Sequence, residues 1–341
     1  MGRGGAVRAG PARALCPHGV RTTRVPWGEP GSRFTLLFER LEIAWLREAT
    51  PTAVARRLGL TWDETRRIMA RAVRRGLARR QPAVVPPLGI DETRFLKRHQ
   101  YVSVVVDLDA ARILPVADDR HAVSLAPFFE GLSEAQRTGI TALAMDMWEP
   151  YRKTLRVHVP EADRKIVFDA FHVMQHVLPT VDTVRKQEHR ALAAAGTSPL
   201  TRTEDAWLNN PTTCSAKAWR EFAALRDSPL QTARAWAMKE RLRHLWDYTD
   251  VGAARTCSRR WYGWAMRSRL EPMKKFARMR QRPLEHILTY LKHRITNAVT
   301  EGLNAKIPWI KYSARGYRDR ETFKMAIYFH CGGLDLEPHV G

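Results

Sequence analysis

The stretch that constrains the fold most is an apolar run with a carboxylate at its centre, residues 88–95 (LGIDETRF). A second run rich in Val, residues 101–107, follows almost at once. A charge in the middle of a buried strand is costly unless it is paired or holds a metal. We therefore interpret Asp91 as the first member of a site, the alternative being that this strand assignment is wrong.

The segments that follow predict a mixed sheet. Residues 113–116 come after a polar turn and complete an antiparallel meander of three strands. Residues 121–129 and 151–157 have a helical pattern, and between them a short buried strand, 140–145, ends on Asp146. A further strand, 165–168, ends on Asp169. The order βββαβαβ predicts an α/β core with a mixed sheet of the ribonuclease-H kind.

A third acid, Glu301, lies in a late segment that predicts one long helix over residues 284–307. Its polar stripe comprises Arg294, Asn297, Glu301 and Asn304. If this helix packs across the sheet, Glu301 meets Asp91 and Asp146, and three carboxylates suit Mg²⁺ or Mn²⁺. Two such ions can activate a water or sugar hydroxyl for in-line attack on phosphorus. Asp169 is a weaker candidate ligand, and each acid taken alone could be an ordinary turn or cap residue.

The charge of the chain indicates a polyanionic partner. It carries 57 Lys and Arg against 35 Asp and Glu, a formal net charge of +22. Such a field favours nucleic acid. An anionic membrane is the weaker alternative, since no apolar stretch reaches the ~18 residues of a spanning helix. The absence of an apolar signal core and the wide spacing of the four cysteines suggest a cytoplasmic protein.

Residues 34–80 predict a helix-turn-helix. Thr50 and Pro51 open a short helix that stops at Gly59, and Thr61 with Glu64 forms a capping box for the next. Two short helices joined by a tight turn, the second rich in arginine, are typical of DNA-binding domains. The alternative is a helical hairpin with a solvated basic face. The candidate DNA contacts on the second helix are Arg66, Arg67, Arg71 and Arg74.

Three other segments allow weaker interpretations. Residues 171–283 are helical and basic, and we expect most of their tryptophans to be structural, with 259–262 (RRWY) as the exception. Residues 306–320 mix aromatic and basic side chains, as a nucleic-acid surface does, or form a solvated basic loop. The candidate contacts there are Lys306, Lys311 and Arg315. Near the N-terminus, Cys16 and His18 are either half of a Zn²⁺ site or an unliganded turn.

Five motifs in order, GIDETRF, LAMDMWEPY, IVFDAFHV, TNAVTEGLNAKI and ARGYRDRETF, resemble the ISL-three (ISL3) family of bacterial insertion-sequence transposases. The resemblance implies an N-terminal zinc segment, a helix-turn-helix and a ribonuclease-H-like core carrying a DDE triad. It also implies a helical insertion between the second Asp and the Glu, and cut-and-join chemistry on the element's DNA ends. Matched by motif, the triad is Asp91, Asp146 and Glu301. The N-terminus departs from the family, since only Cys16 and His18 remain of the cysteine-rich zinc segment.

We therefore expect a DDE transposase that cleaves and joins DNA with Mg²⁺. Its partners would be double-stranded DNA, as terminal inverted repeats and target, and further copies of itself in a homodimer or larger assembly at the bacterial nucleoid. The alternatives are a ribonuclease-H-like structure-specific nuclease and a non-catalytic DNA-binding protein derived from a transposase. The expected domains are a basic N-terminal segment (1–33), the helix-turn-helix (34–80), a linker (81–87), the catalytic core (88–170 and 284–330), the helical insertion (171–283) and a tail (331–341).

Overall fold

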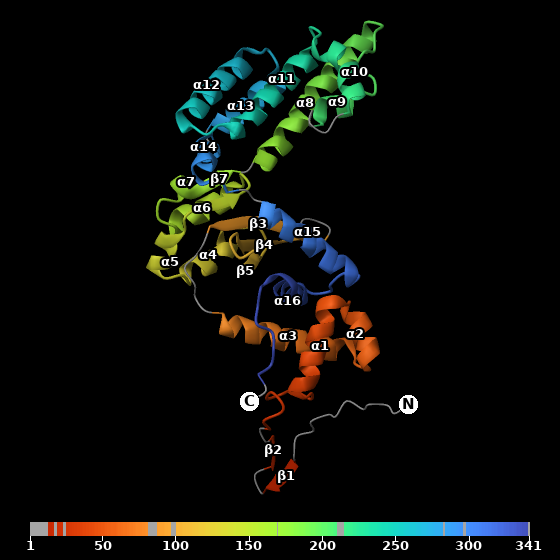
Figure 1. The fold of residues 1–341 in the computed structure, drawn as a ribbon, viewed down its shortest axis with the longest axis vertical. Helices are drawn as coiled ribbons and strands as arrows, with labels where there is room; N and C mark the ends of the chain where they lie inside the picture. Colours follow the sequence, from red (N-terminus) through yellow and green to blue (C-terminus); the bar gives the residue numbers. More distant parts are fainter. Residues whose placement is uncertain are drawn as a thin grey trace. The chain divides into compact units, whose positions relative to one another are not determined.

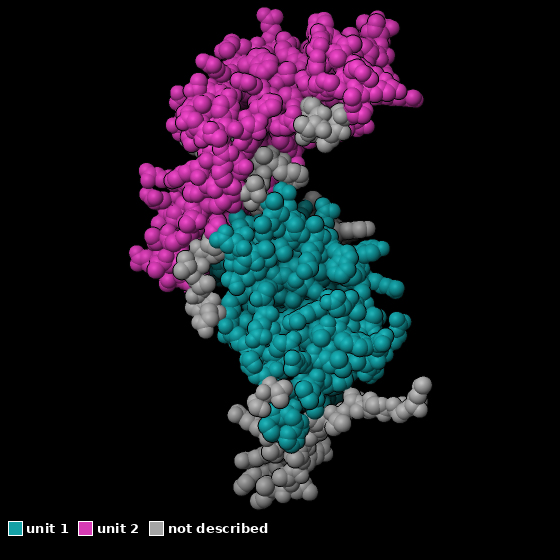
Figure 2. Space-filling model, in the orientation of Figure 1, with its two compact units in different colours: residues 1–85, 91–128, 298–341 teal, residues 86–90, 129–297 magenta. Residues whose placement is uncertain are grey.

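The computed structural model in Figure 1 describes residues 25–80, 87–96, 100–168, 170–209, 215–281, 284–295 and 298–339, and the backbone of 13–16 and 19–22. Two compact units are distinguished in Figure 2: unit 1 holds 1–85, 91–128 and 298–341, and unit 2 holds 86–90 and 129–297. Unit 1 thus joins the expected helix-turn-helix to part of the expected core, and unit 2 contains the expected helical insertion. Most of the expected linker lies outside the described residues.

Unit 1 begins with a short antiparallel hairpin and three helices. Strands β1 (Arg13–Cys16) and β2 (Gly19–Thr22) precede helices α1 (Leu36–Glu48), α2 (Pro51–Leu58) and α3 (Trp62–Arg79). The three helices share an apolar core, which confirms the periodicity of the sequence. Its buried members include Ile43, Leu46, Val54, Ala55, Ile68, Met69, Ala72 and Val73.

Local capping sets the turn between α2 and α3. The hydroxyl of Thr50 accepts a hydrogen bond of 3.3 Å from the N–H of Ala53, and Pro51 occupies the first turn of α2. Gly59 ends that helix in the left-handed region, at a φ of 66°. The capping box of Thr61 and Glu64 then starts α3, as its sequence predicts.

Five strands form a mixed sheet in the order β5-β4-β3-β6-β7. Strand β6 pairs in parallel with both β3 and β7, whereas β4 and β5 are antiparallel. The structure therefore confirms a mixed sheet in which a meander precedes strands that alternate with helices. The strands are β3 (Leu88–Leu96), β4 (Gln100–Asp107), β5 (Arg112–Asp118), β6 (Leu143–Met145) and β7 (Ile166–Phe168).

Helices link the strands and cover part of the sheet. The expected helices are present as α4 (Ala122–Glu130) and α6 (Glu149–His158), and each is followed by a shorter one, α5 (Glu134–Gly139) and α7 (Ala162–Lys165). In unit 1, helix α16 (Arg320–Cys331) packs on β5. There the hydroxyl of Tyr328 accepts a hydrogen bond of 2.8 Å from the N–H of Val116.

Unit 2 contains the helical region expected between the second Asp and the Glu. Its tryptophans are largely structural: Trp207, Trp236 and Trp246 are buried. The exception expected at residues 259–262 is wrong for Trp261, which is buried and donates a hydrogen bond of 2.8 Å to the carbonyl of Met238. The helices are α8 (Ala170–Ala194), α9 (Glu204–Leu208), α10 (Ala216–Arg226), α11 (Gln231–Arg243), the 3-10 turn η2 (His244–Asp247), α12 (Val251–Arg267) and α13 (Glu271–Gln281).

The single long helix expected over 284–307 is wrong. Two helices occupy this region, α14 (Leu284–His293) and α15 (Ala298–Ser313). Arg294 adopts a φ of 54° directly after α14, and a residue in the left-handed region ends a helix. Glu301 is consequently in the first turn of a separate helix. In the described part of the chain, no helix is both long and apolar enough to cross a membrane.

Candidate functional site

Asp91 lies where β3 changes from buried to partly exposed. Leu88, Gly89 and Ile90 are buried, whereas Asp91 and Glu92 are half-buried. One oxygen of the Asp91 carboxylate, Oδ1, accepts a hydrogen bond of 2.8 Å from the N–H of Glu92. The other, Oδ2, accepts one of 2.6 Å from the side-chain amide of Asn304. Both oxygens of the carboxylate are thereby held by hydrogen bonds.

Helix α15 brings Glu301 to the same side as Asn304. The two residues are three positions apart, so their side chains lie on one face of the helix. Since Asn304 reaches Asp91, this face of α15 is directed toward β3. Both Glu301 and Asn304 are half-buried. The polar stripe that the sequence indicates is therefore the face that meets the strand, although Arg294 lies before the helix and Asn297 lies outside the described residues.

Asp146 follows β6 directly, and the register of β6 relates it to β3. Ile90 of β3 pairs with Met145, the last residue of β6. Asp91 follows Ile90 in the chain, and Asp146 follows Met145. Oδ1 of Asp146 accepts a hydrogen bond of 2.5 Å from the N–H of Met147. Among the described residues, however, no three His, Cys, Asp or Glu side chains are grouped as a metal site. The three-carboxylate metal centre accordingly stays a prediction.

The structure does not describe the side chains of two other sets of predicted metal ligands, Asp169 for Mg²⁺ and the pair Cys16 and His18 for Zn²⁺. Asp169 and His18 lie outside the described residues, as does the side chain of Cys16. The backbone of β1 pairs with that of β2, and Cys16 lies opposite Gly19. The Zn²⁺ interpretation of this segment therefore stays a prediction as well.

The arginines of α3 fall into two sets. Arg67 and Arg74 are exposed, and Arg66 is half-buried beside Asp63, with an N–O distance of 3.6 Å. Arg71 instead points into the domain, where its Nε donates a hydrogen bond of 3.0 Å to the fully buried carboxylate of Glu39. Arg71 is thus bound within the domain in this structure, and its expected role as a DNA contact stays a prediction.

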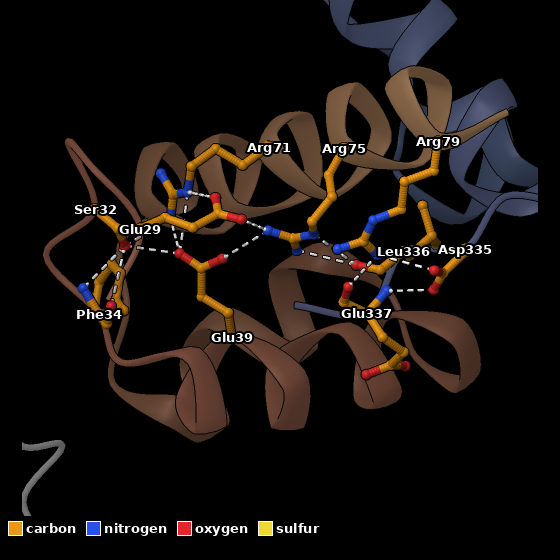
Figure 3. A network of polar contacts seen from close by, with 10 residues as sticks. All are labelled: Glu29, Ser32, Phe34, Glu39, Arg71, Arg75, Arg79, Asp335, Leu336 and Glu337. Carbon is orange, nitrogen blue, oxygen red and sulfur yellow. Dashed lines mark hydrogen bonds and ion pairs between the residues drawn. The ribbon is translucent and has the colours of Figure 1, made fainter. Parts of the chain in front are cut away.

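A polar network continues this arrangement along α3 (Figure 3). Arg75 contacts Glu29 and donates a hydrogen bond of 3.0 Å to the carbonyl of Leu336. Arg79 donates to the carboxylate of Asp335 at 2.9 Å. The tail expected at residues 331–341 is therefore packed on the C-terminal half of α3. The exposed face of α3, which carries Arg67 and Arg74, is the part left to contact DNA.

A basic surface lies next to Asp91 within unit 1. Lys311 is in the last turn of α15, Arg315 lies in the turn that follows this helix, and Arg94 comes from β3. These three side chains line a pocket together with Asn304. Burial, and then the nearby charge of Arg94, lower the pKa of Lys311. Lys306 is exposed on the same helix and donates a hydrogen bond of 2.9 Å to the carbonyl of His330.

Sequence reasoning missed two members of this surface. Arg94 lies three residues after Asp91 on β3, and the strand gives no motif that singles it out. Asn304 is visible in the sequence as a poor helix former within a polar stripe, but its hydrogen bond to Asp91 joins residues more than two hundred positions apart. Only the structure connects them.

Comparison with known proteins agrees with this architecture. A family model described as "Transposase" matches residues 88–327, well over half of the chain. A second, described as "Helix-turn-helix domain of transposase family ISL3", matches residues 23–73, where α1 and α2 and part of α3 lie.

Two similar proteins come from bacteria. The transposase for insertion sequence element IS1001 of Bordetella parapertussis is 28% identical over 91% of this chain and 76% of its own length. The transposase for insertion sequence element IS1557 of Mycobacterium tuberculosis is 26% identical over 91% of this chain and 75% of its own length. With both family models matched in the expected order, the chain belongs to the ISL3 family of transposases.

Proposed function

We propose that this protein is a DDE transposase that cleaves and joins DNA at the ends of its own insertion sequence. The observation that carries the proposal is the contact between Asn304 and Asp91, which turns the face of α15 bearing Glu301 toward β3. The register of β3 and β6, in which Ile90 pairs with Met145, supports the inclusion of Asp146. The strand order β5-β4-β3-β6-β7 supports a ribonuclease-H-like core.

The donor chemistry of these acids fits a hard divalent cation. Carboxylate oxygens are ligands that hard divalent cations prefer, and Asp91, Asp146 and Glu301 would together give an all-oxygen set that suits Mg²⁺ or Mn²⁺. Such ions, when bound, would supply activation of the attacking oxygen and stabilisation of the leaving oxygen.

The other residues of the chain would bind and orient DNA. Asn304 fixes the rotamer of Asp91 through its hydrogen bond. Arg94, Lys311 and Arg315 would hold backbone phosphates beside the reacting one. Arg67 and Arg74, with Arg66, would grip the terminal repeats through the exposed part of α3, at an affinity that falls steeply with salt. Joining two ends would need at least two copies of the chain on DNA.

The decisive experiment separates DNA binding from cleavage. Purified protein is mixed with DNA carrying the inverted ends that flank its gene, and nicking and strand transfer are measured with Mg²⁺. We expect Asp91→Ala, Asp146→Ala and Glu301→Ala to abolish both reactions and to leave binding nearly intact. Asp109→Asn, in the exposed turn between β4 and β5, is the matched control and should retain full activity.

The outcomes distinguish the proposal from its alternatives. Cleavage without joining would indicate a plain nuclease, and binding without any nick would indicate a non-catalytic DNA-binding protein. Metal-dependent cleavage by the Glu301→Ala protein would refute the third ligand while leaving the two aspartates in place.

A further inference from the structure

A pocket of about 1110 Å³ lies beside Asp91, between β3 and the C-terminal half of α15. Ligand pockets for small molecules commonly measure about 300–1,000 Å³, so this one has room for a nucleotide and not for a duplex. Both walls belong to unit 1. The lining residues that matter here are Arg94, Asn304, Pro308, Lys311, Tyr312 and Arg315.

Three cations on these walls indicate an anionic ligand. Arg94, Lys311 and Arg315 line the pocket, and the proximity of Arg94 helps to lower the pKa of Lys311. The one acidic residue of the described lining, Glu92, is directed to Arg120, with an N–O distance of 3.8 Å. Like charges held together repel one another, and a bound phosphate would relieve that repulsion.

The same pocket offers an aromatic surface. The side chain of Tyr312 is 84% exposed, although it is a large and partly apolar group. Pro308 lies one turn earlier on α15 and lines the same pocket. A base stacked on an aromatic ring is the ligand that such a surface suits, because every base has an apolar face. Trp309 is also exposed, at 59%, but does not line the pocket.

Asn304 connects the pocket to Asp91. Its Nδ2 donates to Asp91, and its Oδ1 is buried without a hydrogen-bond partner among the described residues. A buried acceptor left unpaired is costly, and a donor on a bound ligand would satisfy it. The amino group of a base is a donor of this kind.

We propose that this pocket binds a single unpaired nucleotide of the DNA strand beside Asp91. Its phosphate would contact Arg94, Lys311 and Arg315, and its base would stack on Tyr312. An enzyme that works on a duplex can expose the reacting strand by turning one nucleotide out of the stack. The proposal rests on the proposed function in assuming that Asp91 belongs to the cleavage site, but its test does not require cleavage.

The test compares two short DNA duplexes that differ only at one position. In one, 2-aminopurine is unpaired opposite an abasic site, and in the other it is paired with thymine. Both are titrated with the full chain without Mg²⁺. We expect tighter binding of the unpaired duplex, by about fivefold or more, and quenching of its fluorescence by stacking. Tyr312→Phe and the matched control Trp309→Ala should keep this preference, and Tyr312→Ala should remove it.

A second pair of variants tests the phosphate contact. Lys311→Ala should weaken binding of the unpaired duplex several-fold more than Lys306→Ala, since Lys306 is exposed on the same helix but does not line the pocket. A preference that survives Tyr312→Ala, or is absent from the unaltered protein, would overturn the pocket proposal even if the protein cleaves DNA. Loss of the preference for the unpaired duplex in Tyr312→Ala, but not in Tyr312→Phe or Trp309→Ala, would support the pocket proposal. This would hold even if the protein failed to cleave end-containing DNA and the transposase proposal were refuted.

Discussion

The side-chain amide of Asn304 donates a hydrogen bond of 2.6 Å to Oδ2 of Asp91 and thereby ties α15 to β3. A carboxylate that is to bind cations must be held in one rotamer. The backbone N–H of Glu92 holds Oδ1 of Asp91, and the amide of Asn304 holds Oδ2. The same helix carries Glu301 one turn earlier. One amide therefore fixes the orientation of one acid and the placement of the helix that supplies another.

We expect Asn304→Ala to lower the rate of DNA cleavage by about 10- to 100-fold, the range seen when a group that orients a metal ligand is removed. Binding of fully paired DNA should be nearly unchanged. Because the role is one of positioning, the loss should be larger at low Mg²⁺ and partly recovered at high Mg²⁺. A cleavage defect that is independent of Mg²⁺ concentration would contradict this role.

The two sets of arginines on α3 should respond differently to substitution. Arg67→Ala and Arg74→Ala should each weaken DNA binding and reduce the slope of log affinity against log salt by about 1, because each removes one phosphate contact. Neither should change thermal stability, since both side chains are exposed. Gel-shift titrations over a range of salt concentrations measure the slope.

Arg71→Ala is the comparison for Arg67→Ala and Arg74→Ala, because the Arg71 side chain contacts Glu39 inside the domain. It would leave the buried carboxylate of Glu39 without its closest partner, and breaking a buried ion pair costs about 3–5 kcal/mol. We expect a clear fall in the midpoint of denaturant unfolding. If Arg71→Ala instead reduced the salt slope and left stability unchanged, Arg71 would be a DNA contact after all.

Local chemistry explains what could be predicted from the sequence. Thr50, Gly59 and the pair Thr61–Glu64 act within a few residues of one another, so their caps and the helices they delimit follow from the sequence. The mixed sheet follows in the same way from runs of apolar residues and their spacing. The caps depend on contacts between near neighbours in the chain, whereas the sheet follows from the pattern of apolar runs even though β3 pairs with the distant strand β6.

The features that the sequence did not predict depend on distant contacts or on a single backbone angle. The partner of Arg71, Glu39, is 32 residues away, and a basic helical face gives no sign that one of its members turns inward. The break at Arg294 depends on its φ of 54°, at a residue that carries no helix-stop signal. The docking of the tail on α3 likewise joins segments from opposite ends of the chain.

Gly76→Ala should destabilise the protein although it replaces glycine within a helix. A Cβ at this position would lie 2.7 Å from the Cβ of Leu334 and 3.0 Å from the carbonyl oxygen of Asp335, so the tail would have to move. Helix propensity alone predicts the opposite, a gain of about 1 kcal/mol. The measurements are thermal melting and the rate at which a protease cleaves the tail.

Gly302→Ala provides the control for that experiment. Gly302 is also helical, but nothing lies within 4 Å of a Cβ built there. It should therefore gain stability, by up to about 1 kcal/mol. If both substitutions stabilised the protein equally, the tail would not be packed against α3 in solution.

Glu42 in α1 should make the stability of unit 1 depend on pH. Its side chain is fully buried, and burial raises its pKa to about 7, with a smaller contribution from the neighbouring charge of Glu39. The folded state therefore holds a proton that the unfolded state releases near its ordinary pKa of 4.5. Stability from this group is fully present below pH 4.5 and is lost as the pH rises to about 7.

Glu42→Gln should remove that dependence, because the amide is neutral at every pH. The loss between pH 4.5 and 7 amounts to roughly 3 kcal/mol for the unaltered protein. Other carboxylates give a slope of opposite sign, so the informative quantity is the difference in unfolding free energy between the unaltered protein and Glu42→Gln at each pH. We expect this difference to move in favour of the variant as the pH rises from 5 to 7 and to stay constant above. A difference that does not change with pH would mean that Glu42 is ionised in the folded state.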